Sequence, residues 1–286
     1  MAKIIDGKAI SASERQKIKL ETEDFIAKYG FKPGLAVVIV GSDPASKVYV
    51  NNKHKACIEV GFLSRVYELP EETTQDELSV LIKELNNDDE IHGILVQLPL
   101  PGHLDEERVI AEISPEKDVD AFNVQNVGKI MTENYDFLPC TPAGVMVLLR
   151  ESGIDPEGKE CVIIGRSNIV GKPMAMLMMH ANATVTICHR KTKDLKEHTK
   201  RADILIVAMK KAKYVKADMV KEGVVVIDVG INRDENGKLC GDVDFAEVAE
   251  KASAITPVPG GVGPMTITML LRNTLTAARR FAERKL

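Results

Sequence analysis

Tyr49 and Lys53 could carry acid–base chemistry, because they lie four positions apart on one face of a helix expected from about residue 44 to 60. A lysine amine partly removed from water beside a phenol has a lowered pKa, which suits proton transfer near neutral pH. Spacing alone favours the simpler case of a surface lysine lying over a packed tyrosine.

Further polar groups stand where a ligand could reach them. Gln97 lies near the carboxyl end of a strand expected at residues 93–98, and ligands of parallel sheets gather at such ends. Asp118 and Asp120 occupy a loop that could reach the same place. This pair of carboxylates could act in a hydrolase, but a solvated turn is the alternative, since aspartates are also common in turns.

A glycine turn between residues 165 and 173 follows a short strand and opens a helix, which is the context of a dinucleotide site. Gly165 and Gly171 would let the backbone approach a pyrophosphate, and the N-terminus of the helix would supply N–H donors. The GxGxxG spacing is absent, so a tight strand-to-helix turn is the alternative.

Two arginines bear on the choice of cofactor. Arg190 follows the next expected strand, at the position that approaches the adenosine ribose in a doubly wound fold. An acidic residue there would favour NAD, whereas arginine suits the 2′-phosphate of NADP, and Arg166 could be a second cation. A solvated basic turn with Lys191 and Lys193 is the alternative.

The string from Thr256 to Thr266 holds three glycines and three prolines. Proline stiffens a loop and glycine lets its backbone approach a ligand closely, so we expect a binding loop, with a rigid linker as the alternative.

Composition bears on several classes of function. The net charge of -4 gives no basic balance for nucleic acid, and no apolar run approaches the roughly 20 residues of a membrane span. The first ten residues lack the apolar core of a signal peptide. The five cysteines are dispersed and the six histidines lack ligand spacing, so we expect a cytoplasmic protein with no disulfide framework and no metal.

Strand-like runs alternate with amphipathic helical runs along the chain, which predicts α/β architecture with mainly parallel sheets. Thr74 and Glu77 have capping-box spacing before an apolar stripe. The methionines between residues 174 and 179 are expected in a core. Strands are expected at residues 35–40, 62–69, 93–98, 161–164, 184–188, 204–208 and 224–229, and further helices at 7–29 and 264–284.

A Pro-Cys-Thr-Pro string at residues 139–142 interrupts regular structure and marks a domain boundary. We expect one domain at residues 1–140, joined by the last helix (268–286), and a Rossmann-like domain with a doubly wound parallel sheet at residues 141–267.

Taken together, these strings resemble the bifunctional methylenetetrahydrofolate dehydrogenase/cyclohydrolase family. The matches keep the family's order and cover nearly the whole chain. They are residues 40–46 with Tyr49, Val50 and Lys53, then residues 93–101, 117–120, 139–142, 165–173, 228–232, 241–243 and 256–266.

The resemblance implies a multifunctional NADP-dependent oxidoreductase and hydrolase of one-carbon metabolism, which supports purine biosynthesis. It implies that residues 1–140 form a catalytic, folate-binding domain, that a folate cleft lies between the two domains, and that the protein is a homodimer. Lys53 would be the central catalytic residue, Tyr49 would stack on the folate, Gln97 would tune Lys53 and Asp120 would bind the pterin. The implied substrate-binding residues also include Leu98, Pro99, Pro259, Gly260 and Gly261. The implied cofactor-binding residues are Gly165, Arg166, Ser167, Ile169, Val170, Gly171, Arg190 and Ile231.

The sequence departs from the family pattern in three places. Ala121 stands in place of a glycine, a small change unless the residue needs a positive φ. Arg190 stands where many members have serine. Lys210 and Ala212 replace a glycine and a proline in a loop beside the cofactor, so Lys210 could crowd the nicotinamide ribose or point away. If Lys210 crowds the ribose, we expect weakened or altered cofactor binding with the cyclohydrolase retained.

Three other functions compete with this hypothesis. They are a monofunctional cyclohydrolase that binds NADP poorly, another NAD(P)-dependent dehydrogenase, and a nucleotide sensor without catalysis. The set of Tyr49, Lys53, Gln97 and Asp120 argues against the sensor.

Overall fold

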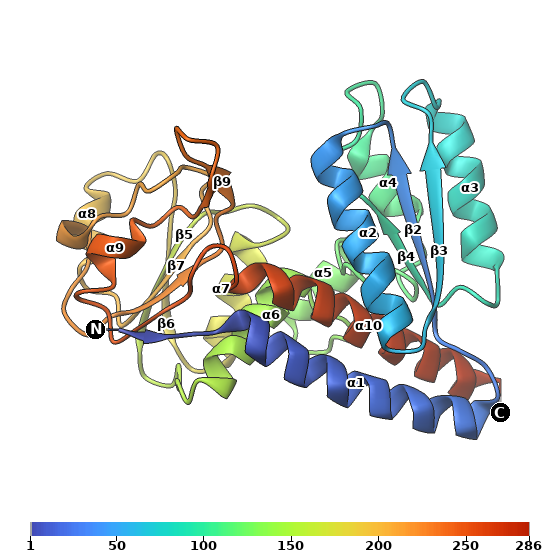
Figure 1. Cartoon of the computed structure of the whole chain (residues 1–286), viewed down its shortest axis with the longest axis horizontal. Helices are drawn as coiled ribbons and strands as arrows, with labels where there is room; N and C mark the ends of the chain where they lie inside the picture. The colour runs from blue at the N-terminus through green and yellow to red at the C-terminus, as the bar shows by residue number, and fades with distance from the viewer. Residues whose placement is uncertain (1, 286) are drawn as a thin grey trace. The chain divides into compact units, whose positions relative to one another are not determined.

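A computed structural model describes residues 2–285, apart from the side chain of Ala45, and the chain divides into two compact units. Unit 1 contains the residues up to Ala12 together with Thr141–Thr266, and unit 2 contains Ser13–Cys140 together with the residues from Ile267 onward. Helices α1 (Gly7–Tyr29) and α10 (Val262–Arg284) therefore contribute to both units (Figure 1).

Unit 2 is built on a parallel three-stranded sheet in the order β3-β2-β4. Its strands are β2 (Gly34–Val40), β3 (Leu63–Leu69) and β4 (Gly93–Val96), and its other helices are α2 (Pro44–Glu59), α3 (Gln75–Asn87), α4 (Glu106–Glu112) and α5 (Val124–Met131). Because β3 and β4 flank β2 on opposite sides, the chain reverses its direction across the sheet next to β2. Such a switch point leaves room for a ligand beyond the carboxyl ends of the strands.

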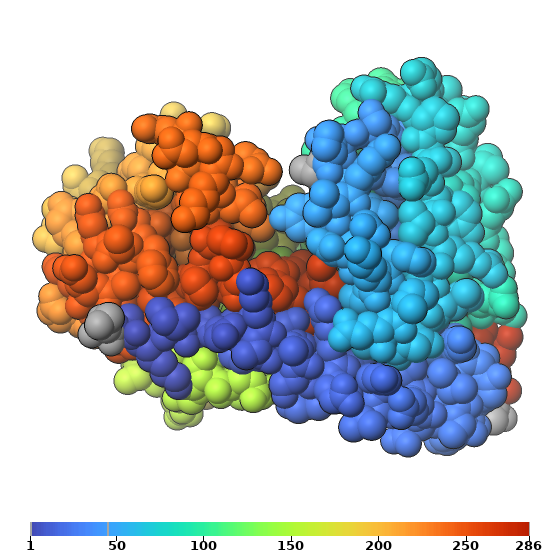
Figure 2. Space-filling view, viewed as in Figure 1, coloured from blue at the N-terminus to red at the C-terminus, as the bar shows by residue number. Residues whose placement is uncertain are grey.

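Alternation along the buried strand β2 divides the core of unit 2 into two faces. Ala36, Val38 and Val40 pack with Leu78 and Ile82 of α3, whereas the other face of the sheet lies under α2 (Figure 1). Figure 2 shows the outer surface of α1, in dark blue, facing the viewer with no other element over it. The inner stripe of α1 includes Ile18 and Phe25 at helical spacing, and both are buried.

Unit 1 is built on a parallel six-stranded sheet in the order β1-β11-β8-β7-β5-β6. Its elements are β1 (Lys3–Ile4), α6 (Cys140–Glu151), β5 (Glu160–Ile164), α7 (Gly171–His180), β6 (Thr184–Cys188), α8 (Leu195–Thr199), β7 (Ile204–Val207), the 3₁₀ turn η1 (Ala217–Met219), β8 (Val225–Asp228), β9 (Asn232–Arg233), β10 (Leu239–Cys240), α9 (Phe245–Val248) and β11 (Ala254–Ile255). The switch point of this sheet lies between β5 and β7, since β6 continues on one side of β5 and β7 on the other.

The sequence predicted the class and most element bounds correctly. The α/β architecture, the doubly wound parallel sheet and helix 7–29 are confirmed, and each expected strand is present within two residues of its expected ends. The two-residue strands β1 and β11 were not predicted, and β1 pairs with β11 at Lys3 and Ala254 in unit 1. Among the methionines, Met174 and Met178 are buried as expected, whereas Met179 is exposed.

The capping box predicted at the start of α3 is confirmed. The Thr74 hydroxyl accepts a hydrogen bond from the N–H of Glu77, and the Glu77 carboxylate accepts one from the N–H of Thr74. We expect Thr74→Ala to lower the free energy of unfolding by about 1 kcal/mol, because the N–H of Glu77 loses its acceptor. Urea unfolding monitored by circular dichroism would measure this change, and Thr74→Ser should stay near wild type. Equal midpoints for Thr74→Ala and wild type would contradict the prediction.

Candidate functional site

Lys53 is held inside unit 2 by a side chain from another element. Its exposed fraction is only 9%, and its Nζ donates a hydrogen bond of 2.8 Å to Oε1 of Gln97. The other end of the amide is fixed, since Gln97 Nε2 donates to the Leu98 carbonyl oxygen at 2.7 Å. The backbone N–H of Gln97 also donates to the Val38 carbonyl oxygen at 2.8 Å, which places the residue at the carboxyl edge beside the switch point.

Burial sets the electrostatics of this site. It lowers the pKa of Lys53, against the attraction of the nearby Asp120 carboxylate. Burial also raises the pKa of Asp120 to about 6, although the positive charge of Lys53 favours its ionised form. An amine that loses its proton more readily than usual therefore stands near a carboxyl group that titrates close to neutrality, as acid–base chemistry requires.

Asp118 and Asp120 have different surroundings despite their closeness in the chain. The Asp118 carboxylate is buried and accepts bonds from the N–H of Asn123 and from Asn126 Nδ2, at 2.8 and 2.9 Å. Asp118 also forms a bridge with Ile94 beside β4, so it anchors the loop. Asp120 is the more accessible of the two and is the one available to a ligand.

Two residues that the sequence analysis did not select complete this site. The Cys140 thiol donates to the Val119 carbonyl oxygen at 3.4 Å and to Asp120 Oδ1 at 3.6 Å. Asn273 of α10 donates from Nδ2 to the carbonyl oxygens of Val119 and Leu138, at 2.8 and 2.9 Å. Both side chains are buried and hold the loop that carries Asp120. Cys140 and Asn273 lie 20 and 154 residues from their partners Asp120 and Val119, so local spacing gave no signal for either contact.

The other predicted substrate-binding residues of unit 2 lie nearer the surface. Tyr49 is 40% exposed, one turn before Lys53 on α2, so its ring is open to a planar ligand. Leu98 is half-buried and Pro99 is exposed directly after Gln97.

The glycine turn of unit 1 provides the close approach that a phosphate needs. A Cβ added at Gly165, where φ is +137°, would lie 2.4 Å from the Ala208 carbonyl oxygen, and one at Gly171 would lie 2.3 Å from that of Gly165. The Ser167 hydroxyl accepts bonds from the N–H groups of Val170 and Gly171 at 3.2 and 3.4 Å. The turn, with Ile169 exposed beside it, leads into α7, so its geometry fits a dinucleotide.

Arg166 and Arg190 stand at corresponding places on neighbouring strands. Ile164 pairs with Cys188, and each arginine is exposed two residues beyond its strand. Both therefore follow the carboxyl edge of the sheet, where two guanidinium groups could bind a phosphate.

Other predicted residues of unit 1 lie on loops at the same edge. Ile231 is 48% exposed after β8. Pro259 is exposed, and Gly260 and Gly261 are buried after β11. The Lys8 N–H donates to the Gly260 carbonyl oxygen at 3.1 Å, so the start of α1 holds this glycine loop.

Comparison with known proteins supplies the family. The model of the tetrahydrofolate dehydrogenase/cyclohydrolase catalytic domain matches residues 5–120, and that of its NAD(P)-binding domain matches residues 139–282. The bifunctional protein FolD of Acetivibrio thermocellus is 60% identical over 284 residues, which cover 99% of each chain. That of Magnetococcus marinus is 58% identical over 280 residues and 98% of each chain.

The chain belongs to the tetrahydrofolate dehydrogenase/cyclohydrolase family, as its sequence motifs predicted. Among solved structures, the bifunctional enzyme FolD of Campylobacter jejuni has a TM-score of 0.94 with 53% identity, covering 100% of both chains. The Trypanosoma brucei enzyme, complexed with NADP cofactor and inhibitor, has a TM-score of 0.93 with 39% identity and covers 98% of each. Shikimate 5-dehydrogenase of Thermus thermophilus, at 16% identity and a TM-score of 0.54, shares the fold alone.

Two departures from the motifs of this tetrahydrofolate dehydrogenase/cyclohydrolase family occur at left-handed backbone positions. Ala121 has φ +58° and Lys210 has φ +57°, a region that glycine adopts at lower cost. The Lys210 side chain is exposed, whereas Ala121 is fully buried. Ala121 therefore has the positive φ at which the change from glycine carries a backbone cost.

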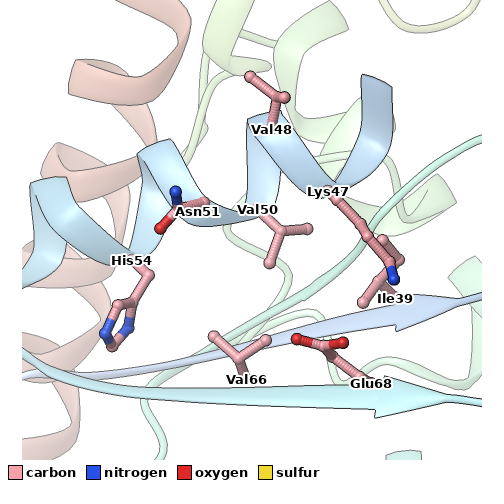
Figure 3. Close-up of a pocket in the computed structure, with 8 residues that line it drawn as sticks. All are labelled: Ile39, Lys47, Val48, Val50, Asn51, His54, Val66 and Glu68. Carbon is pink, nitrogen blue, oxygen red and sulfur yellow. The ribbon is translucent and has the colours of Figure 1, made fainter. Parts of the chain in front are cut away.

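A pocket of about 540 Å³ in unit 2 contains none of the predicted site residues. It lies between α2 and the sheet (Figure 3) and is lined by Ile39, Lys47, Val48, Val50, Asn51, His54, Val66 and Glu68. Lys47, Asn51 and His54 share one face of α2, whereas Tyr49 and Lys53 share another. The pocket and the catalytic candidates therefore lie on different faces of this helix.

Within residues 2–285, no group of three or more His, Cys, Asp or Glu side chains could hold a metal ion. Over this same part of the chain, every helix is too short or too polar to cross a bilayer.

The contact between Cys140 and Asp120 predicts a shift in pH dependence. We expect Cys140→Ala to raise the pKa of Asp120 above about 6 by roughly half a unit, because the ionised carboxylate loses a donor. A rate that needs ionised Asp120 is complete above this pKa and falls as the pH drops through it, so its acid limb should move to higher pH.

Profiles of kcat/KM for the folate against pH would measure this displacement. Cys140→Ser keeps a donor and should leave the acid limb near its wild-type position. Coincident limbs for Cys140→Ala and wild type would exclude this role of the thiol.

Proposed function

We propose that this enzyme oxidises 5,10-methylenetetrahydrofolate with NADP+ to the 5,10-methenyl compound and then hydrolyses that compound to 10-formyltetrahydrofolate. Membership of the tetrahydrofolate dehydrogenase/cyclohydrolase family, over both of its domains, supports both activities. The observation that carries the proposal is the buried Lys53 amine, hydrogen-bonded to Gln97 and close to Asp120.

Lys53 would act in the hydrolytic step. Water adds to the cationic methenyl carbon and loses a proton. The resulting hydroxyl then loses its own proton as the C=O bond forms and the bond from this carbon to N5 breaks, and N5 gains a proton. One proton is released overall. An amine with a lowered pKa can accept the first proton and return one to N5. A permanently charged lysine would instead repel the cationic substrate.

Gln97 would prepare Lys53 for this task without adding a charge. Its Oε1 accepts from the amine, and its Nε2 is already bound to the Leu98 carbonyl oxygen. This arrangement fixes both the amide and the direction of the amine. A carboxylate in its place would raise the pKa of Lys53, so the neutral amide suits a proton acceptor.

Asp120 and Tyr49 would bind the folate. The Asp120 carboxylate can accept hydrogen bonds from the amino and N–H groups of a pterin, and the exposed Tyr49 ring offers a stacking surface. Leu98, Pro99 and the loop of Pro259, Gly260 and Gly261 are proposed as further folate contacts. These assignments follow the family resemblance.

The oxidative step needs alignment more than acid–base groups. NADP+, when bound, accepts the hydride from the methylene carbon, which requires the two reacting atoms to be close together. Residues 165–171 would hold its phosphates, with Gly165 and Gly171 giving the close approach, and Ile231 would contact the cofactor. Arg166 and Arg190 would bind the 2′-phosphate, which is the proposed basis for NADP over NAD.

The proposal includes a cytoplasmic homodimer formed through unit 1. β6 is an edge strand of the six-stranded sheet, and its Ile187 is 40% exposed. An open strand edge with an apolar side chain is a suitable surface for pairing with a second copy. Five free, buried cysteines are consistent with a reducing compartment.

We expect Lys53→Met to reduce the cyclohydrolase rate by at least 100-fold, because a thioether can neither accept nor donate the proton. Two spectrophotometric assays on one preparation would measure the rates. One follows formation of the methenyl compound with NADP+, and the other follows hydrolysis of the methenyl compound added by itself. Lys55→Met is a matched control on the exposed side of α2 and should retain both rates. Unchanged hydrolysis by Lys53→Met would remove this residue from the mechanism.

The same two assays separate the proposed function from a monofunctional cyclohydrolase, in which hydrolysis would persist while oxidation with either nucleotide stayed undetectable.

We expect Arg190→Ser to raise the KM for NADP+ by about tenfold and to leave that for NAD+ nearly unchanged, because only NADP+ carries the 2′-phosphate. Initial rates of oxidation with each nucleotide would measure the ratio. Equal losses with both nucleotides would mean that the arginine does not recognise this phosphate.

A further inference from the structure

The carboxylate of Asp242 gathers three consecutive backbone donors. The N–H groups of Met209 and Lys210 donate to its Oδ2 at 2.7 and 3.1 Å, and that of Lys211 donates to Oδ1 at 2.6 Å. A fourth bond of 2.9 Å comes from Asn232 Nδ2. Asp242 is fully buried, so these bonds replace the hydration that its charge has lost.

The segment that Asp242 holds lies at the switch point of the six-stranded sheet. Residues 208–211 follow β7, and β7 pairs with β5, which leads into the glycine turn. Gly165 lies tightly against the Ala208 carbonyl oxygen, since a Cβ added at Gly165 would be only 2.4 Å from it. A displacement of residues 208–211 would therefore reach the proposed dinucleotide site directly.

Two glycines make room for this arrangement. A Cβ at Gly230 would lie 2.3 Å from Cγ of Asp242, and one at Gly241 would lie 1.8 Å from Oδ2 of Asp228. Asp228 in turn accepts from the N–H groups of Asp242 and Val243, at 3.0 and 2.9 Å. The backbone of Asp242 is thus held by Asp228, while the carboxylate of Asp242 binds the loop.

The loop needs this support because Lys210 has φ +57°. A non-glycine residue in this region is disfavoured by about fivefold or more relative to its right-handed conformation. Three convergent bonds from adjacent N–H groups favour the left-handed conformation, because they are formed together only when the backbone curls around the carboxylate. The exposed Lys210 side chain then points outward from this bond cluster.

We propose that Asp242 is a positioning residue for the nicotinamide cofactor, acting through the backbone of Met209, Lys210 and Lys211. The inference rests on the proposed function, since it assumes that NADP+ binds beside the Gly165 turn. By this inference the Asp242 carboxylate stabilises Lys210 in the left-handed backbone conformation that glycine would adopt more easily. Since folate hydrolysis is proposed to use Lys53 and Gln97 of unit 2, we expect it to continue when this loop is displaced.

The test is Asp242→Asn, which keeps the size of the side chain but replaces one acceptor oxygen with an amide donor facing the loop. Calorimetric titration of the enzyme with NADP+ should show a dissociation constant at least tenfold higher. The cyclohydrolase rate, measured without nucleotide, should stay within twofold. Asp244→Asn is the matched control, with the same charge change two residues away at an ion pair with Lys216, and it should bind NADP+ as wild type does.

A second variant separates positioning from general damage to unit 1. Lys210→Gly removes the cost of the left-handed conformation, so adding it to Asp242→Asn should recover at least threefold in NADP+ affinity. If Asp242→Asn alone fails to fold, Asn232→Ala removes one bond from the same carboxylate and should weaken NADP+ binding about threefold.

The outcomes separate this inference from the proposed function. A folded Asp242→Asn enzyme that binds NADP+ within twofold of wild type would overturn the inference, as would a double variant that recovers nothing. Unchanged NADP+ binding by Asn232→Ala, where Asp242→Asn does not fold, would overturn it too. A wild-type enzyme that binds no NADP+ would instead refute the proposed function.

Discussion

The burial of one amine places the strictest demand on unit 2. Lys53 has lost nearly all its water, and an ammonium in such a place needs an acceptor and a nearby negative charge or must give up its proton. Gln97 supplies the acceptor, and Asp120 supplies the charge while itself being pushed toward neutrality. Their positions fix the relation of α2, the end of β4 and the loop after Asp118. Chemistry and local fold are therefore constrained by the same three side chains.

Both units use the same topological rule for this purpose. In unit 2 the chain reverses across β2, and Gln97 stands at the carboxyl edge beside that reversal. In unit 1 it reverses between β5 and β7, and the glycine turn meets Ala208 there. Parallel strands leave diverging connections at such points, so backbone groups remain open to a ligand. The sites differ in what fills the opening: side chains in unit 2 and mainly glycine backbone in unit 1.

Local sequence signals predicted the elements well but not their partners. The Thr74 capping box depends on residues three positions apart and is present as expected. The bond between Lys53 and Gln97 spans 44 residues and that between Asn273 and Val119 spans 154, so spacing carried no signal for either. The strand β1 escaped prediction because two residues are too short for an alternation pattern. Family resemblance, rather than periodicity, placed Gln97 and Asp120 with Lys53.

The left-handed residues Ala121 and Lys210 show why a substitution cannot be judged from its size. At Ala121 the unfavourable φ costs about 1 kcal/mol, but the buried methyl group contributes about 0.8 kcal/mol that glycine would forgo. Alanine is therefore nearly as good as glycine there. Lys210 is exposed and gains no such burial, so its compensation must come from the backbone bonds to Asp242. At these two positions a different contact therefore offsets the cost of the left-handed backbone: apolar packing at Ala121, and the bonds to a buried carboxylate at Lys210.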